Sequence, residues 1–235
     1  MAVVPAPDAY HLAQAEAGHG ADTNTGVSNA KLGIWLFLAT EVMFFGALFL
    51  VLGVNRYLNP EAFEKASEKL VWQIGGINTL VLLTSSLTMV LAVHYAKLGR
   101  RGMLLLFLLA TAALGGVFLS LKGYEYYIDY TESLIPGWKF DEHEWIESEG
   151  LSPGQVPHVK IFLSMYWVMT GMHALHVTIG ITVMLILALL AYLNCFSAEH
   201  YAPIDVAGLY WHFVDIVWIF LLPMIYLLGT HKEIF

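Results

Sequence analysis

The fold is decided by residues 161–193, which read IFLSMYWVMTGMHALHVTIGITVMLILALLAYL. This run of 33 residues contains no Asp, Glu, Lys or Arg. A helix needs about 20 predominantly apolar residues to cross the hydrocarbon core of a bilayer, at about 1.5 Å per residue. The run therefore predicts a membrane-spanning helix that tilts strongly or projects at one end.

Four further apolar runs are long enough to span a bilayer, at residues 32–54, 75–96, 103–121 and 206–228. The composition agrees, because 58% of the residues are hydrophobic and only 13% are charged, whereas about 25% are charged in soluble domains. We therefore predict an all-α integral membrane protein. A bundle of five transmembrane helices fills residues 31–235, and a polar N-terminal tail fills residues 1–30.

Small residues predict close helix contacts. Ala112, Gly116 and Ser120 recur at every fourth position of the third run, and Gly75 serves similarly in the second run. Lipid tails provide no hydrophobic drive between helices, so small side chains let two backbones approach. We expect both faces to pack on neighbouring helices.

Two connections between the spans differ in charge. Residues 97–102 form a basic turn, whereas residues 122–160 form an acidic extramembrane loop. The basic turn favours the cytoplasmic side, which places the N-terminus in the cytoplasm and both the loop and the C-terminus outside. A count of Lys and Arg over all segments favours the reverse, with seven in the segments assigned to the outside and four in those assigned to the inside. Because the N-terminal segment resembles neither a secretory signal nor a transit peptide, we expect a bacterial plasma membrane.

Charge and cysteine content exclude other classes of protein. The net charge is −8 and the basic residues are scattered, which argues against a nucleic-acid partner. The single cysteine, Cys195, can form neither an internal disulfide nor a zinc or iron–sulfur ligand set.

Ionisable residues at membrane depth are costly and mark candidate sites. Five stand out: Glu41, His173, His176, His212 and Asp215. Two histidines three residues apart, a third histidine and two carboxylates have the right chemistry for a metal site. The alternatives are a buried hydrogen-bond network that holds the helices together, and a proton path that includes Glu41.

Four weaker candidates lie toward the ends of the spans, as contacts to lipid or to a partner: His94, Glu125, His200 and Trp211. For Glu125, packing or a salt bridge to Lys122 is the simplest interpretation. For His94, an ordinary interfacial histidine is the alternative to a lipid phosphate contact.

The blocks that carry these residues resemble subunit III of the haem-copper oxygen reductases, the cytochrome c oxidase family, in a short five-helix form. The resemblance rests on KLGIWLFL at 31–38 with EVMFF at 41–45, NT at 78–79 with LTSS at 83–86, YEYY at 124–127, TGMHALHV at 170–177 and YWHFVDIVW at 210–218. It covers nearly all of the chain from Lys31 onward.

The resemblance implies a non-redox accessory subunit of an aerobic respiratory complex, without catalytic residues, haem, copper or another metal of its own. Haem and copper would lie in the partner catalytic subunit I. The third subunit would contact subunit I and other oxidase subunits, hold structural phospholipids, sustain proton uptake and protect the complex from inactivation during turnover. A larger respiratory supercomplex is a further expected partner. Glu41 corresponds to the family's intramembrane glutamate that reacts with carbodiimides.

The class of oxidase stays open at this point. Many family members have two additional helices at the front, and short forms occur in cytochrome c oxidases, quinol oxidases and a nitric-oxide-reductase-associated branch. Glu41 and the acidic loop favour the cytochrome c class. The rival from another class is an independent metal-dependent membrane enzyme that uses His173, His176, His212 and Asp215.

Overall fold

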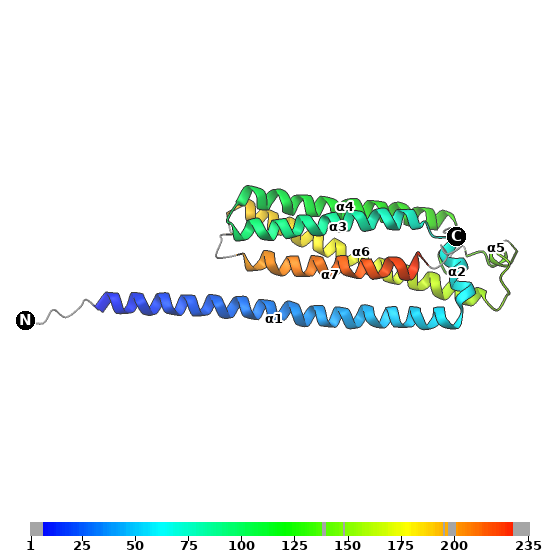
Figure 1. The fold of residues 1–235 in the computed structure, drawn as a ribbon, viewed down its shortest axis with the longest axis horizontal. Helices are drawn as coiled ribbons and strands as arrows, with labels where there is room; N and C mark the ends of the chain where they lie inside the picture. The colour runs from blue at the N-terminus through cyan, green and yellow to red at the C-terminus, as the bar shows by residue number, and fades with distance from the viewer. Residues whose placement is uncertain (1–6, 138–139, 148, 195, 197–200, 228–235) are drawn as a thin grey trace, which may run out of the picture.

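The computed structural model describes the backbone of residues 7–137, 140–147, 149–194, 196 and 201–227, and side chains within these ranges from residue 31 onward, except at 144. Seven helices occupy the described residues (Figure 1): α1 (Pro7–Leu58), α2 (Pro60–Glu68), α3 (Trp72–Lys97), α4 (Arg101–Thr131), α5 (Glu142–Glu147), α6 (Val156–Tyr192) and α7 (Ala202–Ile225).

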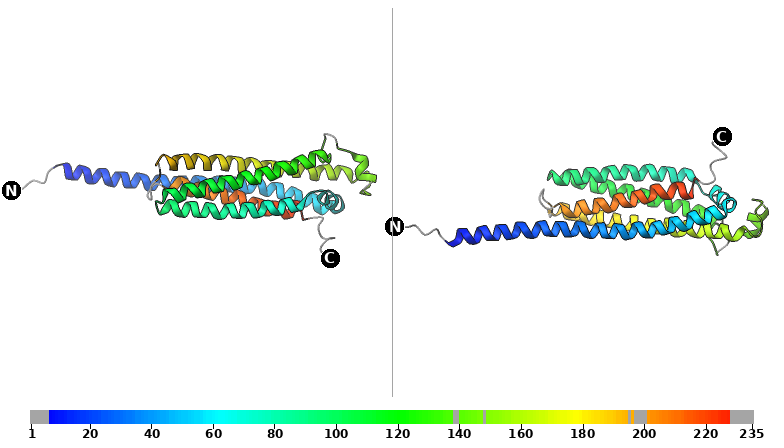
Figure 2. Two further views of the ribbon diagram at one scale, coloured as in Figure 1. Left: turned by 90° about the horizontal axis from the view of Figure 1, so that it is seen from above. Right: turned by 60° about the horizontal axis from the view of Figure 1, so that its bottom comes forward.

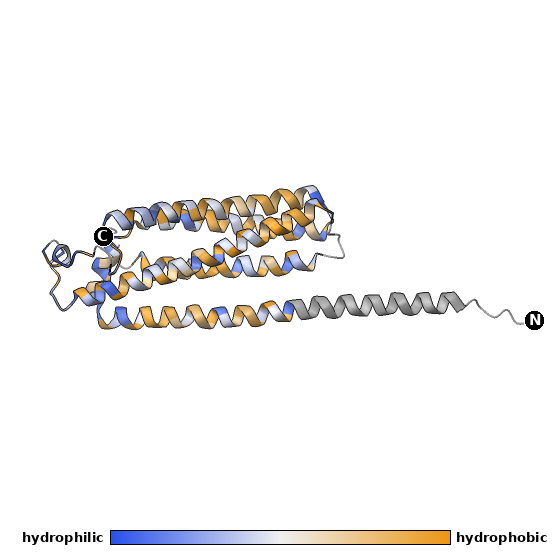
Figure 3. Cartoon of the chain, turned by 180° about the vertical axis from the view of Figure 1, so that it is seen from behind, coloured by the Kyte–Doolittle hydropathy of each residue, from blue (hydrophilic) through white to orange (hydrophobic). Residues whose placement is uncertain are grey.

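Five of these helices are long and apolar enough to cross a membrane, which confirms the predicted all-α membrane bundle. The candidate spans are Lys31–Leu58, Trp72–Lys97, Arg101–Thr131, Val156–Tyr192 and Ala202–Ile225. Hydrophobic residues dominate the long helices where they lie side by side (Figure 3).

One helix is longer than expected, because α4 continues ten residues beyond the predicted end at Leu121. Lys122, Glu125 and Asp129 are three and four residues apart, so they lie on one face of the helix, and this face is buried. The acidic segment outside the long helices therefore starts at Glu132. It contains the short helix α5, which lies beyond one end of the long helices (Figures 1 and 2).

The long helices run roughly side by side (Figures 1 and 2). α3 and α4 form a hairpin, α6 packs on α4 and α7, and α7 packs on α3. α1 lies at the edge of the bundle against α6 and α7. We call the end that carries α2 and α5 the α5 end, and the end that carries the α3–α4 turn the hairpin end.

The hairpin end is closed by specific polar contacts. Gly99 adopts φ +66°, a left-handed conformation that costs glycine little, and this lets the chain reverse between α3 and α4. The Arg101 guanidinium then donates to the Asn194 side chain and to the Tyr192 carbonyl, which ties the start of α4 to the end of α6.

At the α5 end, α2 buries a face of small and aromatic side chains, with the Phe63 ring 5.2 Å from that of Phe162 on α6. Glu149 then fastens the acidic connection to α2, 2.9 Å from Lys69 Nζ and 3.3 Å from Lys65 Nζ. The hydrogen bond from Lys69 lowers the pKa of Glu149. Hydrogen bonds to Glu68 and Glu149 raise the pKa of Lys65.

Close packing in the bundle centres on Trp211. A Cβ atom on Gly180 would lie 2.6 Å from the Trp211 ring, and one on Gly115 would lie 2.9 Å from it, whereas one on Gly116 would meet nothing within 4 Å. Of the small residues that the sequence proposes for helix contacts, Gly75 in the second run does pack closely, since a Cβ atom there would lie 2.8 Å from Leu222. In the third run the contact lies at Gly115 instead of Gly116, because spacing identifies a small-residue stripe but not the neighbour that fills it.

Candidate functional site

The centre of the candidate site is a pair of side chains that joins α1 to α6. Glu41 Oε2 lies 3.2 Å from His176 Nε2, and the two side chains are 19% and 10% exposed. The other ring nitrogen of His176, Nδ1, lies 2.8 Å from the backbone carbonyl of Met172, one turn earlier in α6. Both nitrogens of the ring therefore have a partner.

The ring orientation of His176 is set by its backbone contact. A carbonyl oxygen only accepts, so Nδ1 carries a hydrogen and points to Met172. Nε2 then faces the Glu41 carboxyl group across the boundary between α6 and α1. The contact between an imidazole and a carboxyl group therefore ties these two helices together.

Aromatic residues surround this pair. The Phe45 ring lies edge-on to His176 at 5.5 Å, and Phe213 lies 6.4 Å from Phe45. The Tyr210 hydroxyl donates to the His176 carbonyl at 3.0 Å, which holds α7 against α6 beside the pair. The pair is thus sealed by rings on the α7 side, whereas Glu41 keeps some exposure on α1.

His173 is three residues before His176, but the structure separates the two histidines. His173 is 1% exposed and lies between Phe118 and Trp218, with ring centroids at 5.4 and 5.0 Å. Neither of its ring nitrogens has a hydrogen-bond partner among the described residues. Each residue turns an α-helix by about 100°, so residues three apart differ by about 60°, and this difference sends His176 to α1 and His173 to α4 and α7.

The third part of the predicted network lies between α7 and α3. His212 Nδ1 is 2.8 Å from the Ser86 hydroxyl. Asp215 is 3% exposed and lies beside the same serine, but neither of its carboxyl oxygens meets the geometric criteria of a hydrogen bond in the described part of the chain. Thus the five predicted residues do not meet at one point: Glu41 with His176 and His212 with Ser86 form polar contacts between helices, whereas His173 is enclosed by aromatic rings.

This separation bears on the metal hypothesis. Among the residues that the structure describes, no three His, Cys, Asp or Glu side chains are grouped so that they could hold a metal ion. The arrangement favours the alternative interpretation, polar contacts that hold neighbouring helices together.

Of the four weaker candidates, two are buried, one is exposed and one lies outside the described residues. Trp211 and Glu125, expected at a lipid or protein surface, are instead both buried. Trp211 donates from Nε1 to the Ser85 hydroxyl at 2.9 Å, because a buried indole N–H needs an acceptor. His94 is exposed and lines a surface pocket of about 280 Å³ with Lys97, Asp205 and His212. His200 lies outside the described residues.

Sequence analysis missed a buried ionic cluster between α4, α6 and the end of α7. We call it the lysine cluster, and its members are Lys122, Glu125, Asp129, Tyr166 and Tyr226. Each of these side chains is at most 2% exposed. Lys122 Nζ lies 3.1 Å from Glu125 Oε1, which confirms the expected salt bridge but places it inside the bundle.

The signal that would have revealed the lysine cluster is the spacing 122, 125 and 129, which places three charged residues on one helix face. The span was ended at Leu121 because a lysine there suggested the membrane surface. The two tyrosines could not be assigned, since only tertiary structure brings Tyr166 and Tyr226 to this face.

Comparisons with known proteins agree with the resemblance seen in the sequence. Residues 157–230 match the family described as cytochrome c oxidase subunit III. The chain is 27% identical to the probable quinol oxidase subunit 3 of Staphylococcus haemolyticus, over 88% of this chain and 96% of that protein. It is 30% identical to the cytochrome bo(3) ubiquinol oxidase subunit 3 of Pseudomonas aeruginosa, over 94% and 96%.

A eukaryotic relative belongs to the same family. The cytochrome c oxidase subunit 3 of Arabidopsis thaliana is 30% identical, over 85% of this chain and 68% of that protein. These similarities extend over most of the described helices. The chain belongs to the cytochrome c oxidase subunit III family of the haem-copper oxidases.

Proposed function

We propose that this chain is the non-redox third subunit of a proton-pumping haem-copper oxygen reductase, where it stabilises catalytic subunit I and supports its proton uptake. The observation that carries the proposal is the Glu41–His176 pair, in which a carboxyl group and an imidazole lie 3.2 Å apart between two candidate membrane spans. Glu41 belongs to α1, and only 17% of the apolar window of that span is buried within the chain. The remaining surface of α1 is available to lipid and to subunit I.

Cytochrome c is the proposed electron donor of the complex. The acidic connection after α4 supports this choice, because carboxylates attract a basic protein donor. The second candidate is a quinol oxidase, favoured by the two bacterial relatives that are named as quinol oxidase subunits. Activity of the purified complex with reduced cytochrome c and with a quinol distinguishes the two.

We place the complex in the bacterial plasma membrane, with the hairpin end in the cytoplasm and the α5 end outside. Lys97, Arg100 and Arg101 support this orientation, since they cluster at the hairpin end. The exposed pocket beside His94 and Lys97 is the proposed contact with a phospholipid headgroup.

The first test is purification in mild detergent through a tag on this chain. We expect a haem-copper catalytic subunit to co-purify, with all haem and copper assigned to the partner subunits. A stable free chain that carries its own metal and shows its own turnover would overturn the proposal.

The second test separates a protonic role of Glu41 from a structural one. In Glu41→Gln the amide can still donate a hydrogen bond to His176 Nε2, but the titratable carboxyl proton is gone. We expect normal assembly, a nearly unchanged initial rate and a shorter active lifetime under turnover. Glu41→Leu, which also loses the contact to α6, is expected to weaken retention of this subunit as well.

A matched control is Glu147→Gln, because Glu147 is an exposed carboxylate on α5. It is expected to change neither rate nor lifetime. An immediate loss of proton pumping in a fully assembled Glu41→Gln complex would instead indicate a direct proton path through Glu41. Equal lifetimes of Glu41→Gln and the parent complex would leave the pair with a purely structural role.

A further inference from the structure

The lysine cluster has one anion more than it can compensate if all of its carboxyl groups are ionised. It contains one ammonium group, Lys122, and two carboxyl groups, Glu125 and Asp129, at 0% and 1% exposure. A buried charge without a partner costs several kcal/mol. The distribution of hydrogen bonds shows which carboxyl group is compensated.

Lys122 uses its three N–H donors on three acceptors. They point to Glu125 Oε1 at 3.1 Å, to the Tyr166 hydroxyl at 3.1 Å and to the Tyr226 hydroxyl at 2.5 Å. The Tyr226 hydroxyl in turn donates to Glu125 Oε1 at 2.6 Å. Glu125 therefore receives the ammonium group and a phenol, which together stabilise it as a carboxylate.

Asp129 receives fewer stabilising contacts than Glu125. The Tyr166 hydroxyl has a single hydrogen, with Asp129 Oδ2 at 2.6 Å and Glu125 Oε1 at 3.0 Å as its acceptors. The shorter contact assigns the hydrogen to Asp129. The second oxygen of each carboxyl group, Asp129 Oδ1 and Glu125 Oε2, is buried without a hydrogen-bond partner among the described residues, so the two groups differ only in the donors to Oδ2 and Oε1. One neutral donor is poor compensation for a buried carboxylate that also lies near the Glu125 anion.

The other charged groups toward the pocket are Glu132, three residues later, and Glu68 and Lys69 of α2. Glu132 adds a further negative charge, and Lys69 forms an ion pair with Glu149 at 2.9 Å. The titratable residues of α3 are His94, Tyr95 and Lys97, at the hairpin end of that helix and away from Asp129. On α6 and α7 the groups that face it are the two tyrosines of the lysine cluster.

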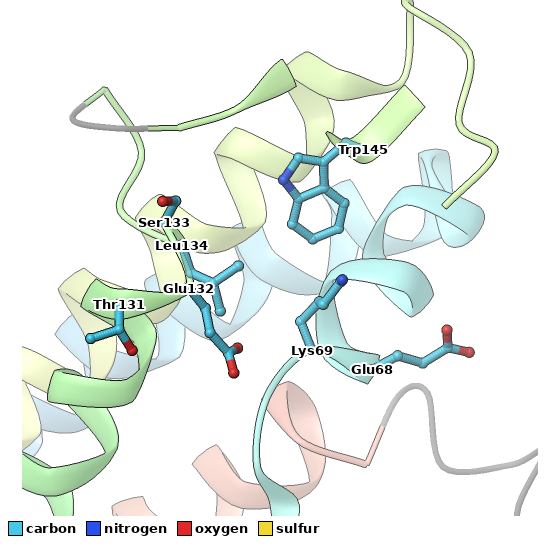
Figure 4. Close-up of a pocket in the computed structure, with 7 residues that line it drawn as sticks. All are labelled: Glu68, Lys69, Thr131, Glu132, Ser133, Leu134 and Trp145. Atoms are coloured by element: carbon cyan, nitrogen blue, oxygen red, sulfur yellow. The ribbon is translucent and has the colours of Figure 1, made fainter. Parts of the chain in front are cut away.

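A surface pocket at the α5 end begins two residues after Asp129, at Thr131. It has a volume of about 550 Å³, and its lining includes Thr131, Glu132, Ser133 and Leu134 from the end of α4 and the turn that follows (Figure 4). Asp129 is in the last turn of α4, and its carbonyl accepts a hydrogen bond from the Leu134 N–H at 3.0 Å. Glu132 is exposed and lines this pocket, so its carboxyl group is in contact with the water there.

We propose that the lysine cluster is a proton-binding site in which Asp129 carries one exchangeable proton, received from water in this pocket by way of Glu132. Hydronium protonates the Asp129 carboxylate and leaves the carboxylic acid and water. Lys122 stays an ammonium ion and Glu125 stays a carboxylate, so that the occupied cluster is neutral. This site is separate from the Glu41–His176 pair, and its existence does not depend on the accessory role proposed above.

The test is infrared spectroscopy of the purified oxidase complex in water and in D2O. The parent complex is expected to show a carbonyl band of a protonated carboxylic acid that shifts down in D2O and is lost in Asp129→Asn. Loss of a carboxylate band in Asp129→Asn, with no change in the carboxylic acid region, would overturn the proposal. Glu147→Gln is the matched control and is expected to keep the band.

Two further variants keep the test decisive if Asp129→Asn does not assemble. Tyr166→Phe removes the hydroxyl that donates to Asp129, so the carboxylic acid band is expected to shift to higher frequency. If the frequency of the band were unchanged in Tyr166→Phe, the band would not belong to Asp129 and the assignment would be overturned. Glu132→Gln is expected to slow the D2O exchange of the band several-fold, and an unchanged rate would overturn the route through the pocket.

Discussion

Replacing Lys122 by Met removes the only ammonium group of the lysine cluster and keeps a side chain of similar length. Glu125 is then a buried carboxylate with a single phenol donor, and both tyrosine hydroxyls lose the hydrogen bond that they accept. Removal of one partner from a buried ion pair costs about 3–5 kcal/mol. At about 2–4 °C per kcal/mol for a chain of this size, the midpoint of thermal unfolding should fall by roughly 6–20 °C.

The assay is the thermal midpoint at which this subunit unfolds and leaves the detergent-purified complex. Lys160→Met is the matched control, since Lys160 also pairs with a glutamate, Glu142, at 2.5 Å, but the two side chains are 37% and 58% exposed. An exposed pair contributes less than about 1 kcal/mol. The control is expected to shift the midpoint by only a few degrees.

A second substitution tests the mechanism of the loss. Lys122→Met combined with Glu125→Gln removes both charges, so no uncompensated anion remains, and most of the lost stability should return. The reasoning would be refuted if Lys122→Met were as mild as Lys160→Met. It would also be refuted if the double variant were no more stable than Lys122→Met alone.

Two further predictions concern packing and the acidic connection. Gly180→Ala places a methyl group 2.6 Å from the Trp211 ring and should cost about 1–3 kcal/mol of stability in the same thermal assay. In the control Gly116→Ala the added methyl group meets nothing within 4 Å, so this change should be neutral or slightly stabilising. Equal effects of the two substitutions would contradict the packing at Trp211. The pKa of Glu149 is lowered by Lys69, so its ion pair stabilises the α5 region at neutral pH, and this stability is lost as the pH falls below the ordinary glutamate value of about 4.3. Hydrogen exchange of this region should therefore accelerate in acid in the parent chain, whereas Glu149→Gln should exchange fast at all pH values; identical pH profiles would count against the ion pair.

The five spans were predictable because a bilayer imposes a simple length rule on apolar helices. The rule gives the length of an apolar run and not that of the helix, so the predicted span ends at Leu121 whereas α4 continues to Thr131. A lysine can lie inside a bundle when its donors find acceptors, and two acceptors of Lys122 are tyrosines distant in sequence. Hydropathy does not contain that information.

The sequence names candidate residues but not their pairs. Intramembrane position singles out Glu41 and His176, but helical periodicity gives only the face of each helix. It cannot show that α1 and α6 are neighbours, and it groups His173 with His176 although they contact different helices. Trp211 is predicted as a lipid or interface contact, whereas the packed structure buries its ring against Gly115 and Gly180.

The Glu41–His176 pair and the lysine cluster differ in access, and this difference separates what a substitution at each should affect. Glu41 keeps 19% of its side chain exposed on a helix at the edge of the bundle, so lipid or a partner that covers α1 can reach it. Asp129 is 1% exposed and belongs to a cluster that joins three helices, so an additional anion there would lie inside the bundle. A substitution at Glu41 should therefore act mainly on contacts at the surface of α1, whereas one in the lysine cluster should act mainly on the stability of the bundle.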